Sequence, residues 1–189
     1  MRFTKVVLFT VISMTLGPMP LYAQTLTGLE IEELFSKAEE LYTQAQPDMD
    51  AIIELTIYHT VEEAIVKQEI KSNKGLRIIT EELTRDEIVA DMKDKTGKMF
   101  DSSLRRTITN IDYSDDKMSA LVEYTALFMA TVNLSEEAKA LPEYTGMEIL
   151  PFKSLSVCSE RFKLIDQVLK SLGTECKTEL LYGKARAIR

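Results

Sequence analysis

The chain has 189 residues, of which 45% are hydrophobic and 28% are charged, and its formal net charge is −7 at pH 7. The excess of acidic over basic residues argues against a nucleic-acid partner, because phosphate binding depends on clustered Lys and Arg side chains. A chain of this length suits one domain with a real hydrophobic core. The composition therefore predicts a single globular domain that does not bind nucleic acid.

The first 23 residues have the layout of a secretory signal peptide. Arg2 and Lys5 give a basic start, residues 6–16 are apolar, and Ala23 is a small residue at the expected cleavage site. An uncleaved membrane anchor is the rival interpretation, but the apolar core is shorter than the ~20 residues that cross a bilayer. We therefore expect residues 24–189 to form one mature domain that is periplasmic or secreted and has no stable membrane span.

Two capping boxes predict where helices begin. Thr27 with Glu30, and Thr84 with Glu87, have the spacing at which a hydroxyl and a carboxylate each satisfy a free backbone amide. Apolar residues at helical spacing follow the first box until Pro47. The helix after the second box is expected to turn these residues inward: Ile88, Val89, Met92, Thr96, Met99 and Phe100.

The segment between these two helices predicts a short helix followed by a strand pair. The helix is expected over residues 48–58 with Met49, Ile52, Ile53 and Ile57 inward, although its β-branched residues leave a strand as an alternative. Residues 61–71 alternate between apolar and polar side chains. A turn at 72–75 then predicts a return strand over 76–80.

The stretch 105–132 predicts a long β-hairpin around a polar turn at 114–117. Its second half places one set of residues on a common face: Ala120, Val122, Tyr124, Ala126, Phe128, Ala130 and Val132. The opposite face mixes Leu121 and Leu127 with Glu123 and Thr125. We expect the first face to be buried against helices and the second to be only partly covered by another element or a partner.

A second hairpin is predicted from strands at 154–164 and 168–182, with a bulge at Gly173, after an irregular segment that holds one short helix over 135–141. The midpoint between Cys158 and Cys176 falls in the expected turn, so the two cysteines should lie nearly opposite each other. In an exported chain this arrangement predicts a disulfide. Free thiols or a metal site are the alternatives, but two cysteines and a distant His59 give poor metal-ligand spacing.

The order of these elements resembles the nuclear transport factor 2-like superfamily. Residues 83–87 are similar to the opening of its third helix, residues 108–122 to its central hairpin, and Cys158 to a cysteine that begins its last hairpin. The resemblance spans residues 28–182 and implies an α+β, cystatin-like cone in which a curved antiparallel sheet wraps about three helices. It also implies a pocket between the concave face of the sheet and the first two helices.

Enzymes of that superfamily commonly place an Asp, His or Tyr in this pocket, and five residues are candidates for lining it here: Tyr42, Tyr58, His59, Tyr124 and Phe128. His59 titrates in a range that suits proton transfer, but a lone histidine at an element boundary is more often a surface or capping residue. Tyrosines at core spacing usually serve packing. The acidic turn at 112–116 lacks the glycine and the final glutamate of a calcium loop. We therefore expect no metal, no cofactor and no catalytic residue.

Two functions fit these expectations. The first is a non-catalytic binding module whose pocket takes a small apolar ligand, or whose sheet face pairs with an envelope protein or with a second copy of the chain. The alternative is a small cofactor-independent isomerase or dehydratase that uses His59 or a pocket carboxylate. The inward face of the central strand carries no evident polar dyad of the kind that such enzymes use, so the sequence favours binding.

Overall fold

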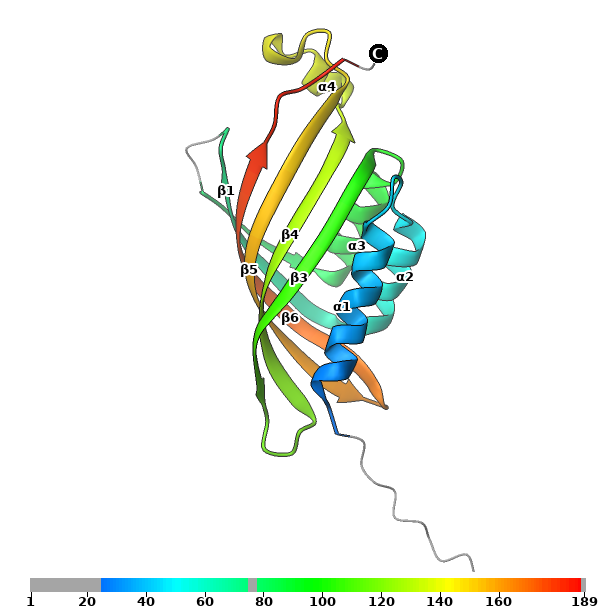
Figure 1. The fold of residues 1–189 in the computed structure, drawn as a ribbon, viewed down its shortest axis with the longest axis vertical. Coiled ribbons are helices and arrows are strands. Elements are labelled where there is room, and N and C mark those ends of the chain that lie inside the picture. Colours follow the sequence, from blue (N-terminus) through cyan, green and yellow to red (C-terminus); the bar gives the residue numbers. More distant parts are fainter. Residues whose placement is uncertain (1–24, 75–77, 188–189) are drawn as a thin grey trace, which may run out of the picture.

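The computed structural model describes residues 25–74 and 78–187, and the predicted signal peptide lies outside them. Three helices lie against one face of a long, curved six-stranded sheet, and a short helix lies beyond one end of the sheet (Figure 1). The helices are α1 (Gly28–Tyr42), α2 (Met49–His59), α3 (Arg85–Lys95) and α4 (Glu136–Lys139), followed by a 3-10 turn (Pro142–Tyr144). No helix in this part of the chain is long and apolar enough to cross a membrane.

The sheet has the strand order β2-β1-β6-β5-β4-β3. The strands are β1 (Thr60–Ser72), β2 (Ile78–Thr84), β3 (Met99–Tyr113), β4 (Ser119–Asn133), β5 (Ile149–Ile165) and β6 (Val168–Tyr182). Neighbours pair antiparallel except β1 and β6, which run parallel. The predicted α+β architecture, a curved sheet around three helices, is confirmed, and the parallel pair is a detail that the sequence did not predict.

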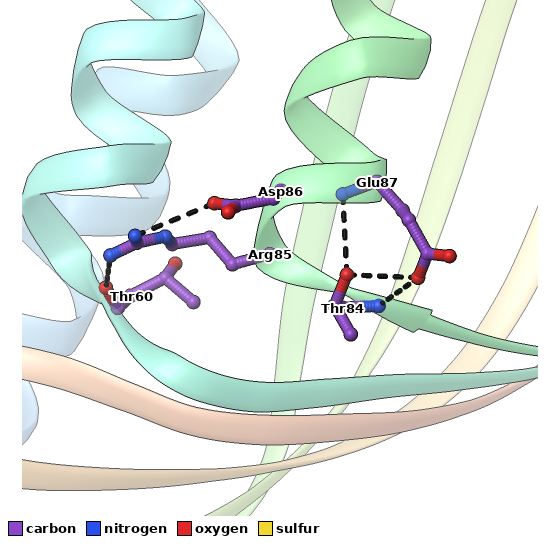
Figure 2. Close-up of polar contacts among 5 residues, drawn as sticks. All are labelled: Thr60, Thr84, Arg85, Asp86 and Glu87. Carbon is purple, nitrogen blue, oxygen red and sulfur yellow. Dashed lines mark hydrogen bonds and ion pairs between the residues drawn. The ribbon is translucent and has the colours of Figure 1, made fainter.

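Both predicted capping boxes are present. The backbone N–H of Thr27 donates to Glu30 Oε2 at 2.8 Å. At the start of α3, the backbone N–H of Thr84 donates to Glu87 Oε2 at 2.8 Å, and the N–H of Glu87 donates back to the Thr84 hydroxyl at 3.3 Å (Figure 2). These bonds satisfy amides that the first helical turn leaves free. They also lower the pKa of the Glu87 carboxyl, because Thr84 donates to it from its backbone and its side chain.

Three details of the predicted helices are wrong. Helix α3 ends at Lys95 because Gly97 adopts a left-handed φ of 72°, a conformation that commonly ends helices. Met99 and Phe100 therefore begin β3 instead of facing inward from α3. Ile57, predicted to be inward on α2, is 45% exposed. The helical interpretation of residues 48–58 itself is confirmed, since Asp48 caps α2 by accepting from the N–H of Ala51 at 3.1 Å.

The predicted two faces of the central strand are confirmed. Ala120, Val122 and Tyr124 of β4 are buried, whereas Leu121 and Glu123 between them are exposed. A second strand with the same alternation, β5, buries Cys158, Phe162 and Leu164 against the same side. Helix α1 covers this inner face with Ile31 and Phe35. A one-residue slip would bury the Glu123 carboxylate, so burial fixes the register of the hairpin.

The last hairpin contains both the disulfide and the predicted bulge. Cys158 lies directly opposite Cys176 in the β5–β6 ladder, and the two form a disulfide. The ladder shifts by one residue next to Gly173, whose φ is 145°. A Cβ at this position would lie 2.8 Å from the carbonyl oxygen of Ile65 on β1, so only glycine allows the approach.

We expect the purified protein to contain no free thiol. The disulfide joins residues that are 18 apart in the sequence, and closing a loop of that length stabilises a protein by about 3 kcal/mol in the chain-entropy estimate. Thiol titration of the unfolded, unreduced protein tests this expectation. Detection of two reactive thiols would contradict the pairing of Cys158 with Cys176.

We expect Phe128→Ala to destabilise the protein far more than Thr125→Ala. Phe128 packs edge-on against the rings of Tyr42 and Phe152, with centroids 5.5 and 5.6 Å away, and removing a packed aromatic ring costs about 3 kcal/mol or more. Thr125 lies on the opposite face of β4, where a truncation usually costs less than about 0.5 kcal/mol. Urea denaturation of both variants checks the ranking, and a larger loss for Thr125→Ala would reverse the assignment of the two faces.

Candidate functional site: a polar cluster in the cone cavity

A cavity of about 280 Å³ lies between the inner face of the sheet and the helices. Its apolar wall consists of Leu34, Phe35, Ala38, Leu55, Val66, Ile88 and Phe162. Its polar groups come from several elements: Thr56, His59, Thr60, Gln68, Arg106, Tyr124, Glu160, Ser171 and Thr174. A mostly apolar concavity with a few converging polar groups is typical of small-molecule sites, and this one is close to their lower size limit of about 300 Å³.

A tyrosine and a glutamate form a hydrogen-bonded pair in this cavity. The hydroxyl of Tyr124 on β4 donates to Glu160 Oε2 on β5 at 3.0 Å. The Tyr124 ring is 5% exposed and meets Phe35 of α1 edge-on, with ring centroids 4.8 Å apart. Burial, and then the negative charge of Glu160, raise the pKa of Tyr124 well above its ordinary value. The phenol therefore keeps its proton at neutral pH and acts as a hydrogen-bond donor to the carboxylate.

Arg106 adds a positive charge to the same cavity. Its guanidinium carbon lies 4.8 Å from the centre of the Phe35 ring, a cation–π arrangement. Its backbone N–H donates to the Glu39 carboxylate, which ties β3 to α1. Its positive charge lowers the pKa of Tyr124 and so opposes the rise that burial and Glu160 cause. The guanidinium forms no ion pair with another described residue, so its donors are available to a molecule in the cavity.

His59, at the end of α2, also lines the cavity. Its Nδ1 lies 2.8 Å from the carbonyl oxygen of Leu169 on β6. A carbonyl can only accept, so Nδ1 carries the proton and Nε2 is the basic nitrogen of the neutral ring. Burial, the main cause, and the charges of Lys170 and Lys37 lower the pKa of His59, although the bond to Leu169 opposes them. The ring is therefore neutral at pH 7, and it is oriented by a backbone carbonyl instead of a carboxylate.

Arg85 holds the end of α2 in place. Its guanidinium extends from the first turn of α3, where Nη1 lies 3.4 Å from the carbonyl oxygen of Thr60 and Nη2 lies 3.5 Å from Asp86 Oδ1 (Figure 2). The Arg85 side chain is 19% exposed. A cation is favourable at the carboxyl end of a helix because the last carbonyls there are unpaired and partly negative. Arg85 thus holds the carbonyl of Thr60, the residue after His59, at the cavity wall.

The five candidate residues from the sequence lie in three environments. His59 and Tyr124 line the cavity. Tyr42 and Phe128 lie outside its lining and pack against each other in a second core cluster that includes Met49. Tyr58 is 56% exposed, with Lys170 4.7 Å from the centre of its ring. Within residues 25–74 and 78–187, no three His, Cys, Asp or Glu side chains gather as metal ligands would.

Glu160 and Arg106 are the residues that the sequence-based interpretation missed. Glu160 occupies an inward position of β5, two residues from both Cys158 and Phe162. Applying the period-two argument to β5 as well as β4 would have found this carboxylate on an apolar face. Arg106 carried no comparable signal, because the stretch around it on β3 contains polar residues on both faces.

No protein-family model matches the chain, and no curated protein is detectably similar to it in sequence. Several solved structures resemble it at low sequence identity. A nuclear transport factor 2-like protein of unknown function from Shewanella oneidensis is 16% identical, with a TM-score of 0.47 over 80% of this chain and 99% of that one. One from Prochlorococcus is 12% identical, with a TM-score of 0.48 over 80% of this chain and 92% of that one. At these identities and TM-scores, the likeness carries no conclusion about the function of this chain.

We expect the stability of the protein to fall as the pH rises above about 10, the ordinary pKa of tyrosine, partly because of Tyr124. The raised pKa means that folded Tyr124 holds its proton after unfolded Tyr124 has lost it. Its contribution to stability is therefore complete below the unfolded pKa and is lost as the pH rises towards the folded pKa. Denaturant unfolding across this range should show a shallower decline for Tyr124→Phe.

Tyr58→Phe is the matched control, because this tyrosine is 56% exposed. Its pH profile should run parallel to that of the wild type. If Tyr124→Phe also ran parallel to the wild type, the buried Tyr124–Glu160 pair would not exist in solution.

Proposed function

We propose that this chain is an exported binding protein whose cone cavity holds a small, mostly apolar molecule with at least one hydrogen-bond donor and one acceptor. The observation that carries this proposal is the Tyr124–Glu160 pair, which lies in the cavity next to its apolar wall. Buried polar groups are expensive unless they are satisfied. Tyr124 takes one oxygen of Glu160, and the other oxygen is suited to a hydroxyl or amide donor of a ligand.

Arg106 supports the choice of a ligand that also carries an acceptor. Its guanidinium lines the cavity on the face of the Phe35 ring. A ligand oxygen placed between Arg106 and Glu160 would be held by a charged donor, while a neighbouring hydroxyl would donate to the carboxylate. With about 280 Å³ available, the ligand is the size of a single ring with short substituents.

Export is part of the proposal. It is supported by the layout of residues 1–23 and by the Cys158–Cys176 disulfide. Disulfides persist in oxidising compartments and are rare where glutathione keeps thiols reduced. Both features are compatible with a periplasmic or secreted protein.

His59 gives a specific reason to consider an enzyme as the second candidate. The ring is neutral at pH 7, and its Nδ1 proton is committed to Leu169, so Nε2 can take a proton from a molecule in the cavity. The Arg106 guanidinium, which also lines the cavity, would stabilise the negative charge that develops on the substrate oxygen. This arrangement suits proton transfer next to a carbonyl, as in a cofactor-independent isomerase or dehydratase.

The binding proposal is tested with a panel of one-ring phenols, cyclic ketones and benzyl alcohols, titrated into ¹⁵N-labelled protein and followed by NMR. Saturable shifts should appear in α1, β4 and β5 around the cavity. Glu160→Gln should weaken the binding of hydroxyl-bearing probes about tenfold, because hydrogen bonds to charged groups contribute about 1.5–3 kcal/mol. Glu175→Gln, an exposed glutamate on β6, is the control. Absence of saturable binding, or equal effects of the two variants, would contradict the proposal.

The same probes separate binding from catalysis. A bound ketone incubated in D₂O should exchange hydrogens next to its carbonyl if His59 acts as a base, and His59→Gln should abolish the exchange without abolishing binding. If the wild type bound the ketone without hydrogen exchange, binding would be supported and the enzymatic alternative would be contradicted.

A further inference from the structure

The sheet has two edges, and the chain itself covers the β3 edge. Backbone N–H groups of β3 that point away from β4 donate to the segment that joins α1 to α2. The N–H of Asp101 donates to the carbonyl oxygen of Ala45 at 2.7 Å, and the N–H of Leu104 donates to the hydroxyl of Thr43 at 3.2 Å. Such cover prevents an edge strand from pairing with another chain.

The β2 edge has no such cover. Strand β2 pairs with β1 alone, and in the part of the chain that the structure describes no group outside β1 forms a hydrogen bond with the backbone of residues 78–83. Alternate residues of an edge strand turn their N–H and C=O groups away from the neighbouring strand. Ile78 and Ile79 on this edge are 58% and 49% exposed. The β2 edge is therefore both open and partly apolar.

The register with β1 places three residues of β2 on the inner face of the sheet, because their partners on β1 include the cavity-lining Val66 and Gln68: Ile79, Glu81 and Leu83. Glu81 is exposed and forms no ion pair with another described residue. The next residue, Glu82, points to the opposite face and lies 3.1 Å from the Lys67 ammonium. The inner row of the open edge thus reads apolar, acidic, apolar, and its carboxylate is unpaired.

We propose that the β2 edge binds an extended segment of a partner protein by strand addition, and that this segment carries a Lys or Arg with an apolar residue two positions away on each side. In an antiparallel pairing, the cation lies opposite Glu81 and the two apolar residues lie opposite Ile79 and Leu83. Backbone hydrogen bonds to a free edge supply affinity, and alternate side chains supply specificity. Opposite charges on directly facing residues add to the stability of such a pair.

The charge of Glu81 also argues against a second copy of this chain as the occupant. An antiparallel pairing of β2 with β2 of another copy that uses every residue of Ile78–Thr84 places Glu81 opposite the partner's Glu81. Like charges directly opposite each other in a ladder are destabilising. Charge complementarity therefore favours a basic segment of a different protein.

The first test uses an N-acetylated, C-amidated peptide, Thr-Val-Thr-Lys-Thr-Val-Thr, titrated at up to millimolar concentration into ¹⁵N-labelled protein. Saturable NMR shifts should appear in β2, and amide hydrogen exchange in residues 78–83 should slow. Glu81→Lys should weaken binding about tenfold or more, because like charges that face each other across an interface are strongly unfavourable. A peptide with Glu in place of its Lys should bind this variant within about threefold of the original pair, since the charges are again complementary. Glu33→Lys, an exposed position on α1, is the control and should leave binding unchanged.

The second test asks whether the contact is a backbone ladder. The peptide is made in two forms that carry N-methyl groups on alternate amides, either on Val, Lys and Val or on the Thr residues between them. Only one set of amides faces β2 in a strand pair. One form should therefore lose binding, and the other should keep it.

Several results would overturn the proposal. They are the absence of saturable binding, equal effects of the two N-methylated forms, equal effects of Glu81→Lys and Glu33→Lys, and a charge exchange without rescue. A dimer of the wild type that the peptide dissociates would assign the β2 edge to a second copy and would overturn it as well. None of these outcomes depends on whether the cavity binds a ligand.

Discussion

The close approach of β1 to Gly173 is the constraint on which the inner face of the sheet depends. The Ile65 carbonyl lies where a side chain on residue 173 would stand, so β1 can run alongside β6 only because that residue is glycine. The bulge beside Gly173 also changes which residues of β6 face inward. Ser171 before the bulge and Thr174 and Cys176 after it all line the cavity. Without the extra residue, strict alternation would turn Ser171 and the pair Thr174–Cys176 to opposite faces.

The bulge at Gly173 thus places Ser171, Thr174 and Cys176 of β6 in the cavity lining, together with Tyr124 and Glu160. Helix α1 closes the opposite side, with Phe35 in contact with the ring of Tyr124 and with the guanidinium of Arg106. The Phe35 ring thus packs against Tyr124 and also stabilises the Arg106 cation on its face. This cation has no carboxylate partner among the described residues. A core built only for stability would use apolar side chains here, since replacing buried polar groups by apolar ones is often neutral or stabilising. The polar groups agree with the proposed binding of a small molecule in the cavity.

The success of the sequence-based predictions depended on how local the signal was. The capping boxes at Thr27 and Thr84 and the alternation on β4 act within a few residues, and all three were confirmed. The cysteine pairing was also predictable, because a hairpin makes the position of a partner a matter of counting from the turn. The parallel pairing of β1 with β6, and the presence of both Arg106 and Glu160 in the lining of one cavity, involve segments that are far apart in the sequence. The pattern of residues within one strand does not predict which distant strand lies beside it or across the cavity from it.

The period of two separates the cavity wall from the outer face of the sheet, which is the face opposite the helices. On β5, Glu160 and Phe162 face the cavity, whereas Leu155 and Val157 face outward. A strand of a packed sheet is rigid on the scale of one side chain, so a polar substitution on the outer face leaves the cavity wall in place.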